Sequence, residues 1–190
     1  FKDEQNINNM GGVWKKLPYT YALMIIGTLA LTGFPFLSGF YSKDAIIEFA
    51  YLRGNTPGYF AVGIGIFTAF LTSIYSWRLL LKTFHGTYNN KKINYESIHE
   101  SPMVMIIPLI ILAIGSIFAG IIFKEVFIGN ESVEILWRDS IFFLNSLSLD
   151  HPPTWVIFLT PILVIISIPI SYYLFILNKN ILNLPPQNWF

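Results

Sequence analysis

The stretch that decides the fold is GTLALTGFPFLSGFYSKDAIIEFAYL at residues 27–52, where an apolar run is interrupted and then resumes with charges inside it. It belongs to a longer apolar region, Leu17–Leu52, whose first half, Tyr19–Leu31, carries no charge. Proline removes a backbone donor and glycine loosens the backbone, so both residue types break helices. Three such residues stand between the halves: Gly33, Pro35 and Gly39. We therefore expect a helix that breaks near residues 33–39 and resumes over Phe40–Leu52.

The resumed half contains three charged residues, Lys43, Asp44 and Glu48. Each charge placed at the centre of a membrane helix costs about 2.5–3.5 kcal/mol on insertion scales. Two explanations are open: the charges meet water at the interface, or they form a site at depth. Lys43 and Asp44 precede Arg53 by about nine residues, or about 13 Å of helix at 1.5 Å per residue. This spacing favours a site near the middle of the membrane.

The composition indicates a membrane protein. Of the 190 residues, 54% are apolar and only 12% are charged, against about 25% charged in a typical soluble domain. The formal net charge of +1 gives no general attraction to nucleic acid, so we expect no nucleic-acid partner. The sequence has no cysteine, which excludes disulfides, thiolate zinc sites and cysteine-ligated iron–sulfur clusters within this chain.

Three further segments are long and apolar enough to cross a hydrocarbon core, which needs roughly 20 helical residues. They are Tyr59–Leu81, Met103–Phe123 and Thr154–Leu177. Together with the broken segment they predict an all-α, polytopic membrane helix bundle of about four crossings. The connections between these segments are polar, and one of them is expected to hold a short surface helix around Val133–Ser146.

The lysines and arginines decide whether Leu17–Leu52 crosses the membrane once or twice, because cytoplasmic flanks collect positive charge. With two crossings the positive residues divide six against five, so the bias nearly vanishes. With one broken crossing they divide eight against three, with Lys43 left in the membrane. The side with eight holds Lys2, Lys15, Lys16, Arg78, Lys82, Lys91, Lys92 and Lys179, and the other holds Arg53, Lys124 and Arg138. One broken crossing is therefore favoured, with both termini on the cytoplasmic or matrix side.

Polar residues recur at helical spacing on the segment that follows the break. They are Thr68, Thr72, Tyr75 and Ser76. Such a stripe either lines a hydrated path or consists of hydroxyl groups that bond to their own backbone, and the sequence does not decide between the two. Arg78 follows the stripe and is interpreted as an anchor at the inner interface.

The remaining polar residues do not form a recognisable catalytic or metal site. The three histidines, His85, His99 and His151, lack ligand spacing, so we expect no metal site. We find no phosphate-binding loop and no nucleophile–base arrangement, and we expect no cofactor in this chain.

Several motifs resemble one family of respiratory membrane proteins. They are MGG at residues 10–12, KLPYT at 16–20, IGTLALTGFPFLSGFYSKD at 26–44 and SIYSWR at 73–78. These residues are similar to chain L of NADH-quinone oxidoreductase and to its mitochondrial counterpart, NADH dehydrogenase subunit 5. The similarity is strongest over Asp3–Gly86, and subunits of multisubunit sodium/proton antiporters share a related version of the long motif.

The resemblance implies an antiporter-like proton channel in the membrane arm of complex I, built from two inverted repeats. Residues 1–86 would end the second repeat, with the broken helix at 17–52 and a helix at 59–81. Residues 87–190 would add helices at 103–123 and 154–177. The pair Lys43–Asp44 matches the charged site of the broken helix, and Glu48 would extend it outward. The first repeat and a lateral helix beyond residues 185–186 would lie outside this sequence, which alone should not pump.

The function expected from this resemblance is coupling of NADH oxidation by quinone to proton pumping, within an assembly that carries the NADH, FMN, iron–sulfur and quinone sites elsewhere. The expected partners are other membrane-arm subunits, especially the neighbouring antiporter-like subunit, and the lipid bilayer. A cation/proton antiporter subunit and a purely structural scaffold are the alternatives. A bacterial plasma membrane is the preferred location, because the inner loop is polar and carries lysines, and a mitochondrial inner membrane comes second.

Overall fold

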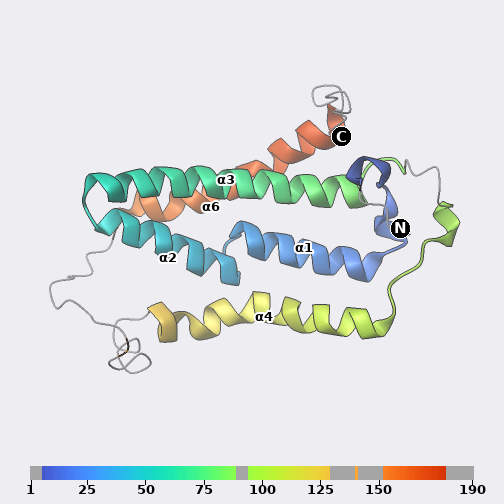
Figure 1. The fold of residues 1–190 in the computed structure, drawn as a ribbon, viewed down its shortest axis with the longest axis horizontal. Helices are drawn as coiled ribbons and strands as arrows, with labels where there is room; N and C mark the ends of the chain where they lie inside the picture. Colours follow the sequence, from blue (N-terminus) through green and yellow to red (C-terminus); the bar gives the residue numbers. More distant parts are fainter. Residues whose placement is uncertain (1–5, 89–93, 129–139, 141–151, 179–190) are drawn as a thin grey trace, which may run out of the picture.

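The computed structural model describes residues 6–88, 94–128, 140 and 152–178, and within them it contains helices and no strand. The long helices run side by side along the long axis of the bundle (Figure 1). They make up four candidate crossings, formed by α1 (Pro18–Thr32) with α2 (Ser38–Leu52), by α3 (Thr56–Phe84), by α4 (Met103–Ile128), and by α6 (Thr154–Tyr172) with the turn that follows it. The all-α membrane bundle predicted from the sequence is confirmed, whereas the predicted surface helix at Val133–Ser146 lies outside the described residues except for position 140.

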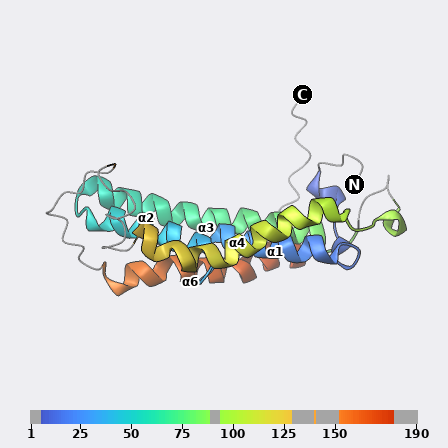
Figure 2. The same cartoon turned by 90° about the horizontal axis from the view of Figure 1, so that it is seen from below.

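The first crossing is made of two helices, α1 (Pro18–Thr32) and α2 (Ser38–Leu52), each of 15 residues. A helix of that length spans only about 22 Å, too short for a hydrocarbon core of about 30 Å. The two helices lie end to end and together run along α3 (Thr56–Phe84), a single helix of 29 residues (Figures 1 and 2). One broken crossing is therefore the correct interpretation of this region.

The break has a defined backbone geometry. Gly33 adopts a left-handed conformation with φ 83°, and its N–H donates to the carbonyl of Ala30 at 3.3 Å. The N–H of Phe34 donates to the carbonyl of Leu29 at 3.0 Å, which completes a Schellman motif at the end of α1. Pro35 follows two residues after Gly33, where it cannot continue the helix. The predicted break is confirmed over residues 33–37, but Gly39 is not part of it, because α2 begins at Ser38 rather than at the predicted Phe40.

The helices α3 and α4 extend slightly beyond their predicted limits, whereas the last crossing has the bounds predicted for it. The helix α4 spans Met103–Ile128, and α6 spans Thr154–Tyr172 before a π-helical turn at Tyr173–Leu177. Within the described residues, α3, α4 and α6 with its π-helical turn are each long and apolar enough to cross a membrane. The described chain begins and ends at the same end of the bundle, as an even number of crossings requires (Figure 1).

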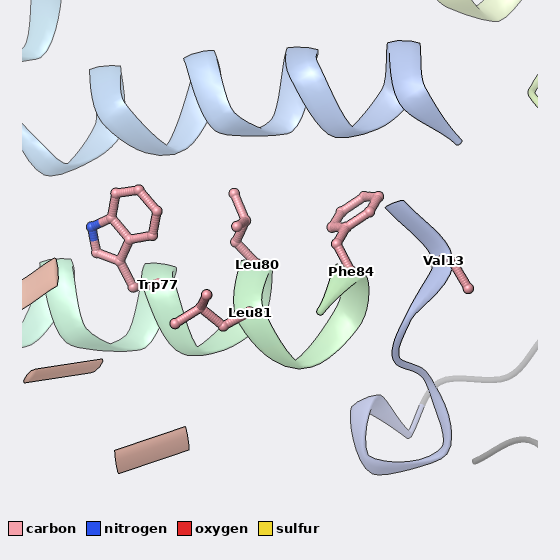
Figure 3. Close-up of a cluster of buried hydrophobic side chains, with 5 residues drawn as sticks. All are labelled: Val13, Trp77, Leu80, Leu81 and Phe84. Atoms are coloured by element: carbon pink, nitrogen blue, oxygen red, sulfur yellow. The ribbon is translucent and has the colours of Figure 1, made fainter. Parts of the chain in front are cut away.

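The packing leaves one face of the bundle largely uncovered. The α1–α2 crossing lies between α3 and α4, while α6 packs across α3 and also contacts α2 (Figure 1). A buried cluster joins the inner end of α3 to the N-terminal segment through Val13, Trp77, Leu80, Leu81 and Phe84. Figure 3 shows Trp77, Leu80 and Phe84 extending from α3 toward α1. Most side chains of α4 face outward, where lipid or another protein surface would cover them.

The described positive charges lie where the topology prediction places them. Lys15, Lys16 and Lys82 lie at the end of the bundle where the described chain begins. Arg53 lies at the other end of the bundle, in the turn between α2 and α3. Lys16 forms an ion pair with Glu96 at 2.7 Å, which connects the N-terminal segment to the loop before α4. The positive-inside asymmetry is therefore preserved among the described residues. The proposed division of the chain at residues 86 and 87 stays a prediction.

Candidate functional site at the helix break

Lys43 reaches back across the break to the end of α1. Its Nζ donates a hydrogen bond of 2.5 Å to the carbonyl oxygen of Leu31. Its side chain passes over Gly33, where an added Cβ would lie 3.4 Å from Lys43 Cδ. The last carbonyls of a helix have no partner within the helix and carry the negative end of its dipole. The ammonium group of Lys43 therefore satisfies a backbone group that the break leaves without a helical partner.

A carboxylate satisfies the opposite end of α1. Glu100 accepts a hydrogen bond of 2.9 Å from the backbone N–H of Tyr19 and another from the hydroxyl of Thr20. Partial burial raises the pKa of Glu100, but the hydrogen bonds from Thr20, Tyr19 and Ser101 outweigh it, and the net pKa is below its ordinary value. The helix α1 thus carries a negative group at its positive end and a positive group at its negative end, the arrangement that its dipole favours.

Asp44 follows Lys43 directly in α2, so their side chains leave the helix about 100° apart. Asp44 is only 8% exposed, and its Oδ2 atom has no hydrogen-bond partner among the described residues. Among those residues Lys43 is not within ion-pair distance of Asp44, so the neighbours in sequence do not form a contact pair. Glu48 lies one turn further along α2 and is half-buried. The break therefore brings together an ammonium group bonded to a backbone carbonyl and a buried carboxyl group, one oxygen of which has no hydrogen-bond partner among the described residues.

The break lies about halfway along the bundle rather than at its surface. Lys43 is the sixth residue of α2, and nine residues separate it from the outer end of the helix at Leu52. At 1.5 Å per residue this separation is about 13 Å. The α1–α2 junction lies beside the middle of α3 (Figure 1). This geometry favours the site at depth over the interfacial explanation for the charges.

The predicted stripe on α3 is not a single surface in the structure. Thr68 and Tyr75 are exposed, whereas Ser76 is buried. The hydroxyl of Thr72 donates to the backbone carbonyl of Thr68 at 2.7 Å, and the hydroxyl of Ser76 donates to the backbone carbonyl of Thr72 at 2.7 Å. For Thr72 and Ser76 the geometry matches the alternative in which hydroxyl groups bond to their own backbone. A hydrated role for the stripe stays a prediction that this geometry does not favour.

The structure shows a buried polar contact that the sequence reasoning missed. Ser73 and Ser167 are fully buried, and their hydroxyl oxygens lie 2.5 Å apart between α3 and α6. Two other hydroxyl groups of α6, those of Thr160 and Ser171, are buried without a partner among the described residues. The helical spacing of Thr160, Ser167 and Ser171 could have indicated a buried polar face on α6. It is a weak indication, because isolated Ser and Thr residues in an apolar helix usually bond to their own backbone.

A groove opens beside the break, between the α1–α2 junction and α4. It has a volume of about 540 Å³ and includes residues of α1, α2 and α4. Gly120 lets α4 approach α2 closely here, because an added Cβ would lie 2.6 Å from Ser38 Cα. Nearby, Lys124 Nζ lies 5.7 Å from the centre of the Tyr41 ring. The groove adds no acidic group to the Lys43–Asp44 site.

The inner end of the bundle holds a histidine in an aromatic setting. His85 Nε2 lies 2.7 Å from the hydroxyl of Tyr21, and the ring stacks on Trp14 with centroids 6.4 Å apart. Desolvation by burial lowers the pKa of His85. No group of three or more metal-ligating side chains occurs among the described residues, so His85 is not part of such a group there.

The lowered pKa of His85 predicts a loss of stability in weak acid. The unfolded chain takes up a proton near the ordinary pKa of about 6.5, before the folded chain does. Stability is therefore lost as pH falls from about 6.5 through the lower folded pKa, and is constant below it. The melting temperature of the purified subunit should fall over this window, and the fall should be smaller in a His85→Gln variant. An unchanged slope in that variant would show that His85 does not cause the loss.

Two family models match successive parts of the chain. Residues 1–72 match the family described as NADH:quinone oxidoreductase/Mrp antiporter, transmembrane. Residues 75–136 match the family described as NADH dehydrogenase subunit 5 C-terminus. The first match contains the whole broken crossing and the Lys43–Asp44 site, and the second begins within α3 and contains α4.

Curated relatives agree with these matches, and each is named NADH-ubiquinone oxidoreductase chain 5. The protein from Marchantia polymorpha is 48% identical over 142 residues, which cover 75% of this chain and 21% of the relative. The protein from Rhizopus stolonifer is 47% identical over 127 residues, which cover 67% of this chain and 19% of the relative. The protein from Dictyostelium discoideum is 48% identical over 143 residues, covering 74% and 21%. The chain thus spans about a fifth of the length of these relatives.

The comparisons correct one expectation and settle the family. These relatives come from a plant, a fungus and an amoeba, so the expected bacterial plasma membrane is not supported. The polar, lysine-bearing inner loop was a poor guide because loops vary more than the helices they connect. Since both family models and these relatives agree along most of its length, the chain belongs to the NADH dehydrogenase subunit 5 family of antiporter-like membrane proteins.

Proposed function

We propose that this chain is part of a proton-translocating membrane subunit of respiratory complex I, located in the mitochondrial inner membrane. The family membership and the names of the relatives support this assignment. In this proposal the chain couples NADH oxidation by quinone to proton movement and carries no redox cofactor itself. Its partners are the other membrane-arm subunits, with the neighbouring antiporter-like subunit the closest of them.

The observation that carries the proposal is the interrupted crossing with an ammonium group at the break and a buried carboxyl group beside it. Interrupted helices at membrane depth are tolerated where the freed backbone is buried in protein or lines a water-filled cavity. Ionisable residues at that depth are costly, and they mark ion and proton pathways. Lys43 and Asp44 meet both descriptions, since Lys43 satisfies a freed carbonyl and Asp44 is buried.

The proposed step is a proton exchange within this site. Lys43 holds a proton while its ammonium group donates to the Leu31 carbonyl, where the end of the α1 dipole stabilises positive charge. When a charge moves in the neighbouring part of the subunit, Lys43 releases its proton toward Asp44. Glu48, one turn further out on α2, passes the proton toward the outer side.

Removing the titratable group of Asp44 tests this proposal. Asp44→Asn keeps the shape of the side chain but cannot release a proton, so transfer through the site should slow by on the order of 100-fold. The measurement is the number of protons translocated per NADH oxidised by the assembled complex in sealed vesicles. Ser42→Ala is the matched control, because the Ser42 hydroxyl bonds to a carbonyl of its own helix at 3.3 Å. Normal stoichiometry in an assembled Asp44→Asn complex would remove Asp44 from the mechanism.

One observation keeps a second function open. The family matched by residues 1–72 includes Mrp antiporters, so this region alone does not separate complex I from a cation/proton antiporter. The match of residues 75–136 to NADH dehydrogenase subunit 5 favours complex I. Sodium-dependent proton movement without NADH in vesicles would favour the antiporter instead.

A further inference from the structure

One face of α6 buries hydroxyl groups toward the rest of the bundle. Val156, Thr160, Val164, Ser167 and Ser171 follow one another at helical spacing, and each is at most 2% exposed. Ser167 has its polar partner, the hydroxyl of Ser73. The Oγ1 atom of Thr160 has none among the described residues, and so it requires an explanation.

The contacts between α2 and α6 set the register of these two helices. Ile47 of α2 and Val156 of α6 meet in one buried cluster with Val62 of α3. At the outer end of the same seam, the rings of Tyr51 and Trp155 lie 5.7 Å apart. The two helices run in opposite directions, because α2 ends where α6 begins (Figure 1).

One turn from that cluster toward the break, the two helices place complementary groups at the same level. Three residues back along α2 is Asp44, and four residues forward along α6 is Thr160. These steps correspond to about 4.5 Å and about 6 Å along the two axes.

The two unpartnered groups are chemically matched. An ionised carboxylate can only accept hydrogen bonds, whereas a threonine hydroxyl can donate one. Both Asp44 Oδ2 and Thr160 Oγ1 are buried, where an unmade hydrogen bond is costly. The two atoms do not bond to each other directly in this structure, and a buried water molecule typically joins two to four such groups.

We propose that Thr160 is a positioning residue for Asp44, and that its hydroxyl donates to a single water molecule that in turn donates to the Asp44 carboxylate. The water holds the carboxylate on the α6 side of α2, apart from Lys43, whose ammonium group is held at the Leu31 carbonyl. Thr160 would thereby fix the separation across which a proton is exchanged. The expected effect on pumping rests on the proposed function. The hydrogen bond between Thr160, the water molecule and Asp44 does not depend on it.

Two substitutions of Thr160 separate a hydrogen-bonding role from a packing role. Thr160→Val keeps the shape and removes the hydroxyl, whereas Thr160→Ser keeps the hydroxyl and removes a methyl group. A hydrogen-bonding role predicts that protons translocated per NADH fall at least twofold in the valine variant and stay near normal in the serine variant. A packing role predicts the reverse. Ser116→Ala on α4 is the control, because the Ser116 hydroxyl bonds to a carbonyl of its own helix at 2.8 Å.

An infrared measurement makes the hydrogen bond testable whether or not the site pumps. The carboxyl vibration of Asp44 in the full complex is assigned by its loss in Asp44→Asn. That band should shift in Thr160→Val and remain in place in Thr160→Ser and Ser116→Ala. An unshifted band in Thr160→Val would overturn the inference. A shifted band with normal pumping in Asp44→Asn would instead support the hydrogen bond and contradict the proposed function.

Discussion

Replacing Gly39 with alanine should prevent the broken crossing from forming. A Cβ at position 39 would lie 1.9 Å from the carbonyl oxygen of Ala30 and 3.0 Å from its carbonyl carbon. Both atoms belong to the backbone of α1, so no side-chain rotation relieves the overlap. The two halves of the crossing would have to separate, and the carbonyl held by Lys43 would move with α1. We expect a destabilisation of about 3 kcal/mol or more, at the upper end of overpacking effects.

The measurement is the amount of folded subunit that enters the assembled complex, with the melting temperature of the purified complex as a second readout. Gly27→Ala and Gly63→Ala are the matched controls, because an added Cβ meets nothing within 4 Å at either position. Both lie inside helices, where alanine is favoured over glycine by about 0.5–1 kcal/mol. If Gly39→Ala assembles as well as these two variants, the close contact between the helix halves is not required for folding.

The sequence was sufficient to predict the break because its signal is local. Glycine and proline act on their own backbone, so Gly33 and Pro35 end α1 wherever that helix lies in the bundle. The number of crossings was also predictable, since the distribution of lysine and arginine distinguishes one crossing from two. These two features together define the architecture that holds the candidate site.

The partners of the site residues could not be predicted in the same way. Helical spacing left direct pairing of Lys43 with Asp44 open, but Lys43 instead bonds to the carbonyl of Leu31. That contact depends on the turn between the helices, where Gly33 and Phe36 have φ values of 83° and 71°. A positive φ at phenylalanine is uncommon, and no periodic pattern in the sequence predicts it.

The α3 stripe shows the same limit on a larger scale. Spacing selected Thr68, Thr72, Tyr75 and Ser76, although the residue whose hydroxyl contacts another helix is Ser73. Ser73 is buried by α6, whose partner residue Ser167 lies almost 100 residues further along the chain. The buried face of a helix depends on its packing partners. A polar stripe in the sequence of one helix therefore identifies candidate residues, but it does not predict which of them contact another helix.

The two contacts at the ends of α1 suggest how the Lys43 site is linked to the inner surface. Glu100 at one end and Lys43 at the other each interact with the same run of aligned peptide dipoles. Loss of either charge would weaken these contacts, because the aligned dipoles favour the charged forms. The proton carried by Lys43 therefore contributes to the stability of the break, and a test of pumping must separate the two roles.

Replacing Lys43 with arginine should separate them, and it should abolish proton transfer through the site while the complex still assembles. The guanidinium group stays protonated and keeps N–H donors for the Leu31 carbonyl, so the end of α1 remains satisfied. It cannot release its proton, and transfer should therefore slow by on the order of 100-fold or more. The measurement is protons translocated per NADH by the assembled complex in sealed vesicles.

Lys43→Leu provides the contrast, because it removes both the proton and the donor. The carbonyl of Leu31 would then be left without its partner at membrane depth, at a cost of about 1–3 kcal/mol. We expect lower assembly and a lower melting temperature in the leucine variant than in the arginine variant, with pumping reduced in both. A scaffold role predicts a different pattern, in which arginine restores everything that leucine loses. Normal pumping in Lys43→Arg would thus assign this residue to the stability of the break, because a permanently charged side chain would then do all that the position requires.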